Sequence, residues 1–212
     1  MNPTRWWWIR HAPVVGSAGR IYGQDDHDCD CSNGDLFAQL ARALPADAIW
    51  ITTPLRRTKL TARALWQAGA AKPAAEREEP AFLEQHFGDW QGLTYDEFSV
   101  LRDGAGHRFW HAPATERPPG GESFADVVDR VGLAIDAIGA AEAGRDLVVI
   151  AHGGSIRGAL AHALAVDPER ALGFVVDNCS LTRLDHFAGE MAWRIGAVNF
   201  LPRGAMPQGA IR

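Results

Sequence analysis

A short apolar run that ends in a cation and an imidazole constrains this chain more than any other feature. Residues 6–9 read WWWI, and Arg10 and His11 follow them directly. Pro13 then stops a helix or a central strand from continuing. The pattern predicts a buried strand whose carboxyl end carries Arg10 and His11, at the edge where open α/β sheets bind ligands. Taken alone, the pair fits a solvated arginine and a packed histidine better than a site, so partners elsewhere in the chain must decide.

A second strand and helix repeat this arrangement later in the chain. Residues 146–151 read DLVVIA and predict a buried strand, which His152, Gly153 and Gly154 follow. A helix is predicted from about Ile156 to Leu164. A histidine and glycines at the start of a helix are typical of an anion site, because the first N–H groups of a helix have no partner within it.

A third segment supplies two more cations. Residues 48–52 predict a short strand, and Thr53 with Pro54 predicts a helix N-cap followed by proline at the first helical position. Arg56 and Arg57 then fall in the first turn of this helix. Cations are unfavourable at the positive end of a helix, so two of them indicate a nearby anion. Solvated surface arginines are the alternative.

The order of the predicted elements fixes the fold class. Apolar periodicity predicts helices over 35–44 and 54–69 and, after a cap at Ser123, one through Ile138. A hairpin is predicted from 180–186 and 191–198. Residues 73–121 are irregular, with short helices predicted at Thr94 and over 107–111. We expect one domain over residues 1–212, an α/β fold that forms a three-layer α/β/α sandwich with a mostly parallel sheet, and 73–121 as an insert that acts as a lid over the active site.

Composition excludes several classes of protein. The chain has 212 residues and a net charge of -5, which argues against a surface for nucleic acid or anionic membranes. No stretch approaches the length of a membrane span or resembles a signal peptide, so a cytoplasmic location is expected. The three cysteines, Cys29, Cys31 and Cys179, form no disulfide framework and are expected to be reduced.

Five segments in the same order closely resemble the histidine phosphatase superfamily, which has the phosphoglycerate mutase-like fold. The resemblance covers nearly the whole chain. The matching segments are Arg10 with His11, Thr53 to Ala62, Glu84 to Leu93, Pro119 to Ser123, and Ala151 to Gly153. Each match is weak by itself, and their order makes the active-site interpretation the preferred one.

The resemblance implies a role for each matching residue. His11 would attack phosphorus and form a phosphohistidine, while Arg10, Arg57 and His152 surround the phosphoryl oxygens. Glu84 would protonate the departing alkoxide and then activate water. The implied substrate contacts come from Arg10, Arg57, His152, Gly153, Tyr22 and Gly23. No metal ion and no cofactor are implied.

Two positions depart from the family pattern. Ala12 and Val14 stand where the family usually has glycine and threonine, and the asparagine common in the next loop is absent near Gly16 and Ser17. The charged catalytic positions are all present, so activity is expected.

The expected function is metal-independent hydrolysis of a small-molecule phosphomonoester. The segment Arg20 to Gly23, with Pro119 to Ser123, looks most like the α-ribazole phosphatase branch. The alternatives are phosphoglycerate mutase-type transfer, a phosphatase for protein phosphohistidine or phosphopeptides, and an inactive phosphate-binding module. The expected partner is a small phosphomonoester, with no nucleic acid and no membrane, and the edge of the C-terminal hairpin favours a homodimer.

Overall fold

A six-stranded sheet forms the centre of the protein, in the order β3-β2-β4-β1-β5-β6. The computed structural model describes residues 2–17, 19–104, 106–189 and 192–202. The first four strands in this order run parallel, whereas β5 pairs antiparallel with both β1 and β6. The predicted mostly parallel sheet is therefore confirmed. The strands are β1 (Thr4–Arg10), β2 (Ala48–Thr52), β3 (Glu76–Glu78), β4 (Asp146–Ala151), β5 (Leu181–Phe187) and β6 (Ala192–Phe200).

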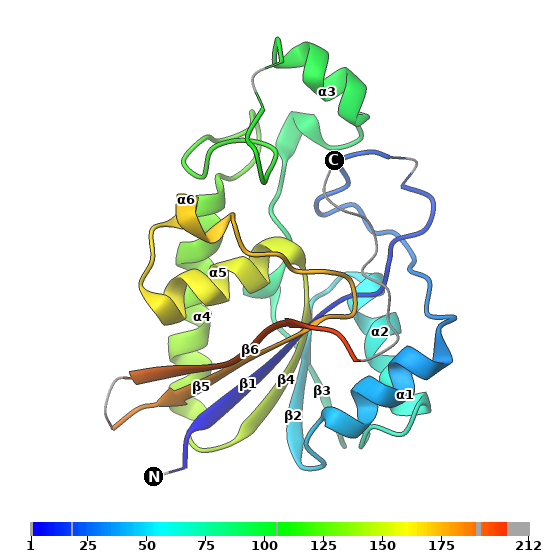
Figure 1. Cartoon of the computed structure of the whole chain (residues 1–212), viewed down its shortest axis with the longest axis vertical. Helices are drawn as coiled ribbons and strands as arrows, with labels where there is room; N and C mark the ends of the chain where they lie inside the picture. The colour runs from blue at the N-terminus through cyan, green and yellow to red at the C-terminus, as the bar shows by residue number, and fades with distance from the viewer. Residues whose placement is uncertain (1, 18, 105, 190–191, 203–212) are drawn as a thin grey trace.

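Helices cover both faces of the sheet. Figure 1 shows α4 and α5 on one side and α1 and α2 on the other, which gives the three predicted layers. The α-helices are α1 (Gly34–Ala43), α2 (Arg56–Gln67), α3 (Tyr95–Leu101), α4 (Phe124–Ala141), α5 (Gly153–Leu164) and α6 (Pro168–Ala171), and the 3₁₀ helices are η1 (Pro80–Phe82) and η2 (Gly88–Trp90). No helix in the described ranges is long and apolar enough to cross a membrane.

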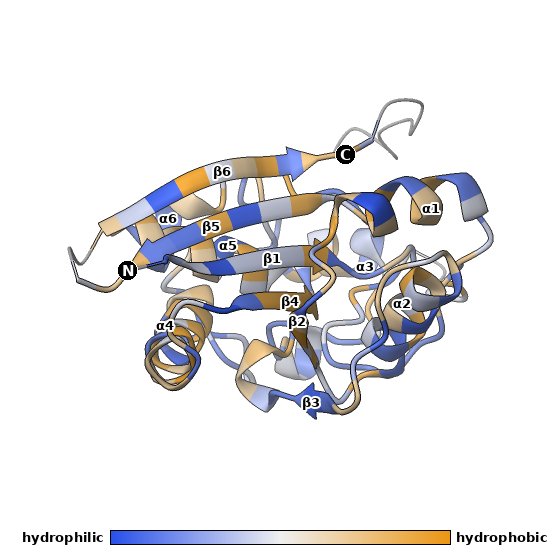
Figure 2. Ribbon diagram, turned by 90° about the horizontal axis from the view of Figure 1, so that it is seen from below, coloured by the Kyte–Doolittle hydropathy of each residue, from blue (hydrophilic) through white to orange (hydrophobic). Residues whose placement is uncertain are grey.

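Alternation along the strands explains the two core layers. Trp6 and Trp8 of β1 pack into the core formed with α4 and α5, whereas Ile9 packs into the core formed with α1 and α2. Successive strand side chains point to opposite faces, so a run with no polar residue fits a strand that is buried on both sides. Figure 2 shows the same contrast in hydropathy: β4 at the centre is largely orange, whereas β5 carries several blue segments.

Several predicted boundaries were wrong. α2 begins at Arg56 with Leu55 at its N-cap, and the hydroxyl of Thr53, two residues earlier, contacts His152, Thr58 and the backbone N–H of Leu55. α5 begins at Gly153, three residues earlier than predicted. Residues 107–111 form bends rather than a helix.

The segment predicted as an insert has a more precise extent. Residues 76–78 belong to the sheet as the edge strand β3, so the irregular part follows β3 and contains η1, η2 and α3. Figure 1 shows α3 at the end of the molecule opposite the N-terminus. The helix starts predicted at Thr94 and Ser123 are confirmed, because each residue forms a capping box, and these begin α3 and α4.

Candidate active site

The carboxyl ends of β1 and β4 bring two histidines together. These strands are parallel neighbours with Arg10 opposite Ala151, so the residues that follow them, His11 and His152, meet at the sheet edge. Their ring centroids lie 5.1 Å apart, and the side chains are 1% and 0% exposed. The register of β1 and β4 therefore creates the pair.

The orientation of the His11 ring follows from one hydrogen bond. Its Nδ1 lies 2.7 Å from the carbonyl oxygen of Ala12. A carbonyl oxygen only accepts, so Nδ1 carries the proton and Nε2 keeps its lone pair. Burial, followed by the charges of Arg57 and Arg10, lowers the pKa of His11 well below its ordinary value of 6.5. A neutral imidazole with a free Nε2 is the form that a nucleophile needs.

Arg57 is the member of the arginine pair that enters the site. It is fully buried, and its Nε donates to Nδ1 of His152 at 3.3 Å. Its two terminal nitrogens donate to the carbonyl oxygens of Asp25 at 2.7 Å and Gly23 at 2.6 Å. Arg56 is exposed and pairs with Asp28, as the surface alternative predicted for it. Adjacent arginines thus lie in opposite environments.

The contacts of Arg57 also fix the state of His152. Because Nδ1 accepts from Arg57, Nε2 carries the proton and donates to the hydroxyl of Thr53 at 2.9 Å. Burial, then Arg57, then His11, lower the pKa of His152 well below 6.5. Both imidazoles at the centre of the site are therefore neutral at pH 7.

Arg10 holds an unpaired donor next to the start of α5. One terminal nitrogen donates to the carbonyl oxygen of Val176 at 2.6 Å. Its buried Nε finds no acceptor within the described part of the chain. A side chain built on Gly153 would approach this Nε to 3.7 Å, so the donor lies beside the first residue of the helix. An unsatisfied buried N–H costs about 1–3 kcal/mol, and an anionic oxygen is the natural acceptor here.

Glu84 is tied to the same helix end. Its Oε1 accepts from the backbone N–H of Gly154 at 3.0 Å and from that of Gln85 at 2.9 Å, and the residue is 7% exposed. A side chain on Gly154 would overlap Oε1 of Glu84, so a larger residue at this position would displace the carboxylate. The structure thus brings Glu84 of the insert to the N-terminus of α5, near Arg10 and His152.

Tyr22 and Gly23 lie on the other side of Arg57. The Tyr22 ring centroid is 5.2 Å from the Arg57 guanidinium carbon, in a cation–π arrangement. Gly23 has φ +41°, and a side chain there would come within 2.9 Å of the Gln85 carbonyl oxygen. Both residues shape the support of Arg57, and their predicted contact with substrate stays a prediction.

The departures from the family pattern fit the local packing. Ala12 is fully buried, and its N–H donates to the hydroxyl of Thr61 at 2.9 Å. Val14 forms an isolated bridge with Cys29. The side-chain amide of Asn178 donates to the carbonyl oxygen of His11 at 2.8 Å, a contact from the segment before β5 that the sequence did not reveal.

Three further residues around the site were not predicted. Arg157 donates to the carbonyl oxygens of Gly153 at 3.2 Å and Phe174 at 2.8 Å, and burial lowers its pKa to about 10. Its spacing of four residues from Gly153 was the available signal, because residues four apart share a helix face. Gln85 and Trp110 lie in the irregular insert, where no periodicity marks them.

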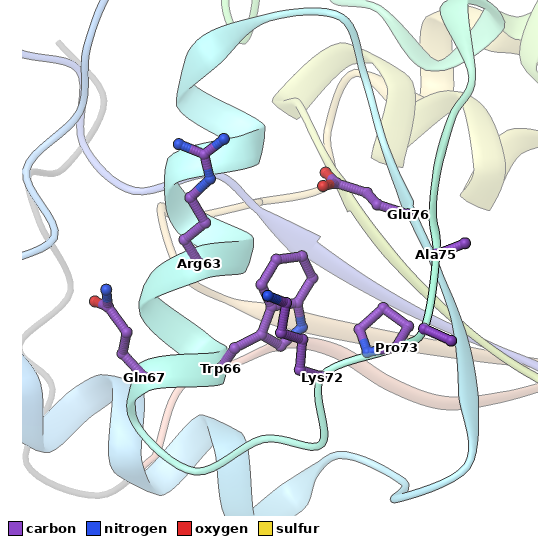
Figure 3. Close-up of a pocket in the computed structure, with 8 residues that line it drawn as sticks. Arg63, Trp66, Gln67, Lys72, Pro73, Ala75 and Glu76 are labelled. Carbon is purple, nitrogen blue, oxygen red and sulfur yellow. The ribbon is translucent and has the colours of Figure 1, made fainter.

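Other features of the structure lie apart from this constellation. A surface pocket of about 570 Å³ is lined by residues of α2 and of the segment that follows it, including Arg63, Trp66 and Lys72 (Figure 3), and by none of the predicted site residues. Within the described ranges, no three His, Cys, Asp or Glu side chains gather in a group that could hold a metal ion.

Comparison with known proteins decides the family. The sequence profile of the histidine phosphatase superfamily (branch 1) matches residues 6–199. The chain belongs to this superfamily. This histidine phosphatase is 33% identical over 180 residues to a glucosyl-3-phosphoglycerate phosphatase of Mycolicibacterium vanbaalenii, which covers 80% of the chain and 75% of the relative. Membership and this relative identify a phosphatase, which is a hydrolase.

Two further similarities extend this result. A 2,3-bisphosphoglycerate-dependent phosphoglycerate mutase of Gloeobacter violaceus is 29% identical over 143 residues, which covers 66% of the chain and 65% of the relative. The solved structure of a mycobacterial glucosyl-3-phosphoglycerate phosphatase matches with a TM-score of 0.78 and 27% identity, over 93% of this chain and 99% of that one. The architecture of this histidine phosphatase is therefore the one that the resemblance implied.

Proposed function

We propose that this histidine phosphatase hydrolyses a small-molecule phosphate monoester, without a metal ion, through a phosphohistidine on His11. The observation that carries the proposal is the His11 ring. Its Nδ1 donates to the carbonyl oxygen of Ala12, and its pKa is lowered, so Nε2 is a free and neutral nucleophile. In the first step Nε2 forms a bond to phosphorus while the bond from phosphorus to the ester oxygen breaks.

Donors around His11 stabilise the charge of the transferring group. In our proposal the phosphoryl oxygens accept from Nε of Arg10, which has no acceptor in the described residues, and from the N–H of Gly153 at the start of α5. Arg57 and His152, which are joined by a hydrogen bond, complete this environment. Donors that are already in place at such a site typically contribute factors of about 10²–10³ each to the rate.

Glu84 handles the protons of both steps. In the first step its protonated carboxyl donates to the departing ester oxygen, which leaves as an alcohol. In the second step the carboxylate accepts a proton from water as that water attacks the phosphohistidine, which releases phosphate and restores His11. The N–H groups of Gly154 and Gln85 hold the carboxylate in place.

The substrate class rests on the insert and on the relatives. Aromatic side chains of the insert pack close to the site. The indole N–H of Trp110 donates to Gln85, and the ring centroids of Phe87 and Trp110 lie 6.1 Å apart. This arrangement favours a small ester over a protein, nucleic acid or membrane partner. The relatives act, by name, on glucosyl-3-phosphoglycerate, whereas the sequence resembles the α-ribazole phosphatase branch. Both esters therefore belong in a substrate panel.

A mutase is the second candidate, because one relative carries that name. A mutase would return the phosphoryl group from His11 to a phosphorylated sugar acid instead of releasing it to water. The site residues serve both reactions, so only product analysis separates them. The expected homodimer and cytoplasmic location are independent of this choice.

The test is an assay in EDTA with purified wild type and His11→Ala. The panel contains p-nitrophenyl phosphate, glucosyl-3-phosphoglycerate, α-ribazole phosphate, a phosphohistidine peptide, and 3-phosphoglycerate with 2,3-bisphosphoglycerate. We expect wild type to release phosphate from a small ester and His11→Ala to lose at least 10³-fold in kcat/KM. Faster isomerisation of phosphoglycerate than phosphate release would establish the mutase instead, and equal rates in the two proteins would reject the mechanism.

A further inference from the structure

Trp110 of the insert touches both sides of the site. Its indole N–H donates to Oε1 of Gln85 at 2.7 Å. Its ring lies 4.8 Å from the guanidinium carbon of Arg157, in a cation–π arrangement. Gln85 follows Glu84 in the chain, whereas Arg157 belongs to α5, so one side chain bridges the two segments between which Glu84 is held.

The first of these contacts leads directly to the carboxylate. Gln85 is 3% exposed, and its side-chain amide also donates to the carbonyl oxygen of Glu122 at 2.8 Å. Its backbone N–H donates to Oε1 of Glu84. Because the Gln85 side chain is held at both ends by Trp110 and Glu122, the N–H that orients Glu84 is fixed as well.

The second contact leads to the start of α5. Arg157 donates to the carbonyl oxygen of Gly153, one residue before the N–H that binds Glu84. A side chain built on Gly154 would lie 3.6 Å from Cζ2 of Trp110, so the indole lies close to this helix end as well as contacting Arg157. Trp110 therefore restrains both donors to the Glu84 carboxylate, one through Gln85 and one through α5.

We propose that Trp110 is a positioning residue that holds the Glu84 carboxyl group at the place where it protonates the leaving group. This inference rests on the proposed function, in which Glu84 is the general acid. Trp110 acts through Gln85 and Arg157 and takes no proton itself. Its effect on the first step, phosphoryl transfer to His11, is therefore confined to substrates that need protonation of the leaving group.

The choice of leaving group separates positioning from general damage. An alkyl phosphate releases a strongly basic alkoxide and depends on Glu84, whereas 2,4-dinitrophenyl phosphate releases a stable anion and does not. General acid catalysis contributes about 10²–10⁴-fold. In Trp110→Phe, which keeps a ring but loses the indole N–H, kcat/KM on an alkyl phosphate should fall by about 10-fold or more. On the dinitrophenyl ester kcat/KM should change by less than about 3-fold, because this constant reports transfer of the phosphoryl group to His11, in which proton donation to that leaving group contributes little.

The experiment compares kcat/KM of wild type, Trp110→Phe, Gln85→Met, Trp193→Phe and His11→Ala on both esters in EDTA. Gln85→Met removes the acceptor of the indole N–H and should show the same selective loss, which keeps the proposal testable if Trp110→Phe folds poorly. Trp193 stacks on His186 in the C-terminal hairpin, at 4.4 Å between ring centroids, so Trp193→Phe is the matched control and should leave both rates unchanged. An equal loss on both esters, or no loss on either, overturns the positioning role while the proposed function stands. If His11→Ala is as active as wild type on both esters, the proposed function is rejected, and the inference with it.

Discussion

The part of the site built on the sheet and the part built on the insert are held in different ways. Arg10, His11 and His152 are placed by two parallel strands whose register fixes them. Glu84 and Trp110 lie in a segment of 3₁₀ helices and bends, and they are placed by side-chain contacts. Many backbone hydrogen bonds between strands together hold the sheet residues in place, whereas each side chain of the insert is held by single hydrogen bonds.

This difference coincides with a division of the proposed chemistry between the sheet and the insert. In the proposed mechanism, the sheet-borne residues supply the nucleophile and the donors to the phosphate, which must be neutral or cationic. The residues of the insert place the proposed proton donor, whose geometry must suit the leaving group. Substitutions in the sheet part should therefore affect every substrate, and substitutions in the insert should affect substrates selectively.

The largest expected effect comes from Arg57. Lysine keeps the charge but loses the directional donors to His152, Gly23 and Asp25. Arg57→Lys should lower kcat/KM by about 10²–10³-fold on every ester. Arg56→Lys is the matched control, because Arg56 is exposed and forms an ion pair with the surface residue Asp28, and it should stay within about 2-fold. Equal effects of the two substitutions would contradict the placement of Arg57 in the phosphate site.

A smaller and selective effect is expected where the two parts meet. In Gly154→Ala the new methyl group would overlap Oε1 of Glu84 and displace the carboxylate. Activity on an alkyl phosphate should fall by about 10–10²-fold, with a lesser loss on the dinitrophenyl ester. Gly158→Ala in the same helix is the control, because the atom nearest to its new methyl group would lie at 3.5 Å, an ordinary contact distance. A Gly154→Ala enzyme that keeps full alkyl phosphatase activity would break the proposed link between Glu84 and α5.

The smallest effect concerns stability against pH. His11 and His152 are buried with lowered pKa values, so they stay neutral in the folded protein while the unfolded chain binds protons below about pH 6.5. The unfolded state then binds more protons, and the free energy of unfolding falls as pH falls through that value. Each histidine contributes up to about 1.4 kcal/mol per pH unit.

Urea unfolding at pH 5.0, 6.0 and 7.5 measures this slope. His152→Asn should flatten it, and His111→Phe in the insert should flatten it less. His111 is only half-buried, although burial and Arg157 lower its pKa to about 4. A slope that neither substitution changes would show that the buried histidines are not responsible.

The sheet part of the site could be predicted from sequence for a physical reason. Buried parallel strands have unbroken apolar runs, so the sequence shows where the strands of residues 6–9 and 146–151 end. The residues that follow two neighbouring parallel strands lie at the same edge of the sheet. The family resemblance decided the assignment of Glu84 as the general acid, because its aromatic neighbours in the sequence fitted a surface glutamate equally well. Trp110 and Gln85 were not predicted, because irregular segments have no period and their contacts join residues 25 positions apart.

Local rules also failed where tertiary contacts compete with them. Thr53 and Pro54 match the pattern of a helix start, yet Thr53 bonds to His152 and the helix begins two residues after Pro54. The edge strand β3 reads ERE and its three residues are exposed, so no apolar pattern marks it. Both cases concern residues whose conformation is decided by partners distant in sequence.

The most direct test of this account is to trap the phosphorylated enzyme. Wild type is mixed with a radiolabelled ester in EDTA, quenched in base within one turnover, and digested, and the label is located by mass spectrometry. We expect up to one phosphoryl group per chain, on Nε2 of His11, absent in His11→Asn and longer-lived in Glu84→Gln because hydrolysis is then slow. Turnover at the full rate with no label on His11, or with label on another residue, would contradict the account.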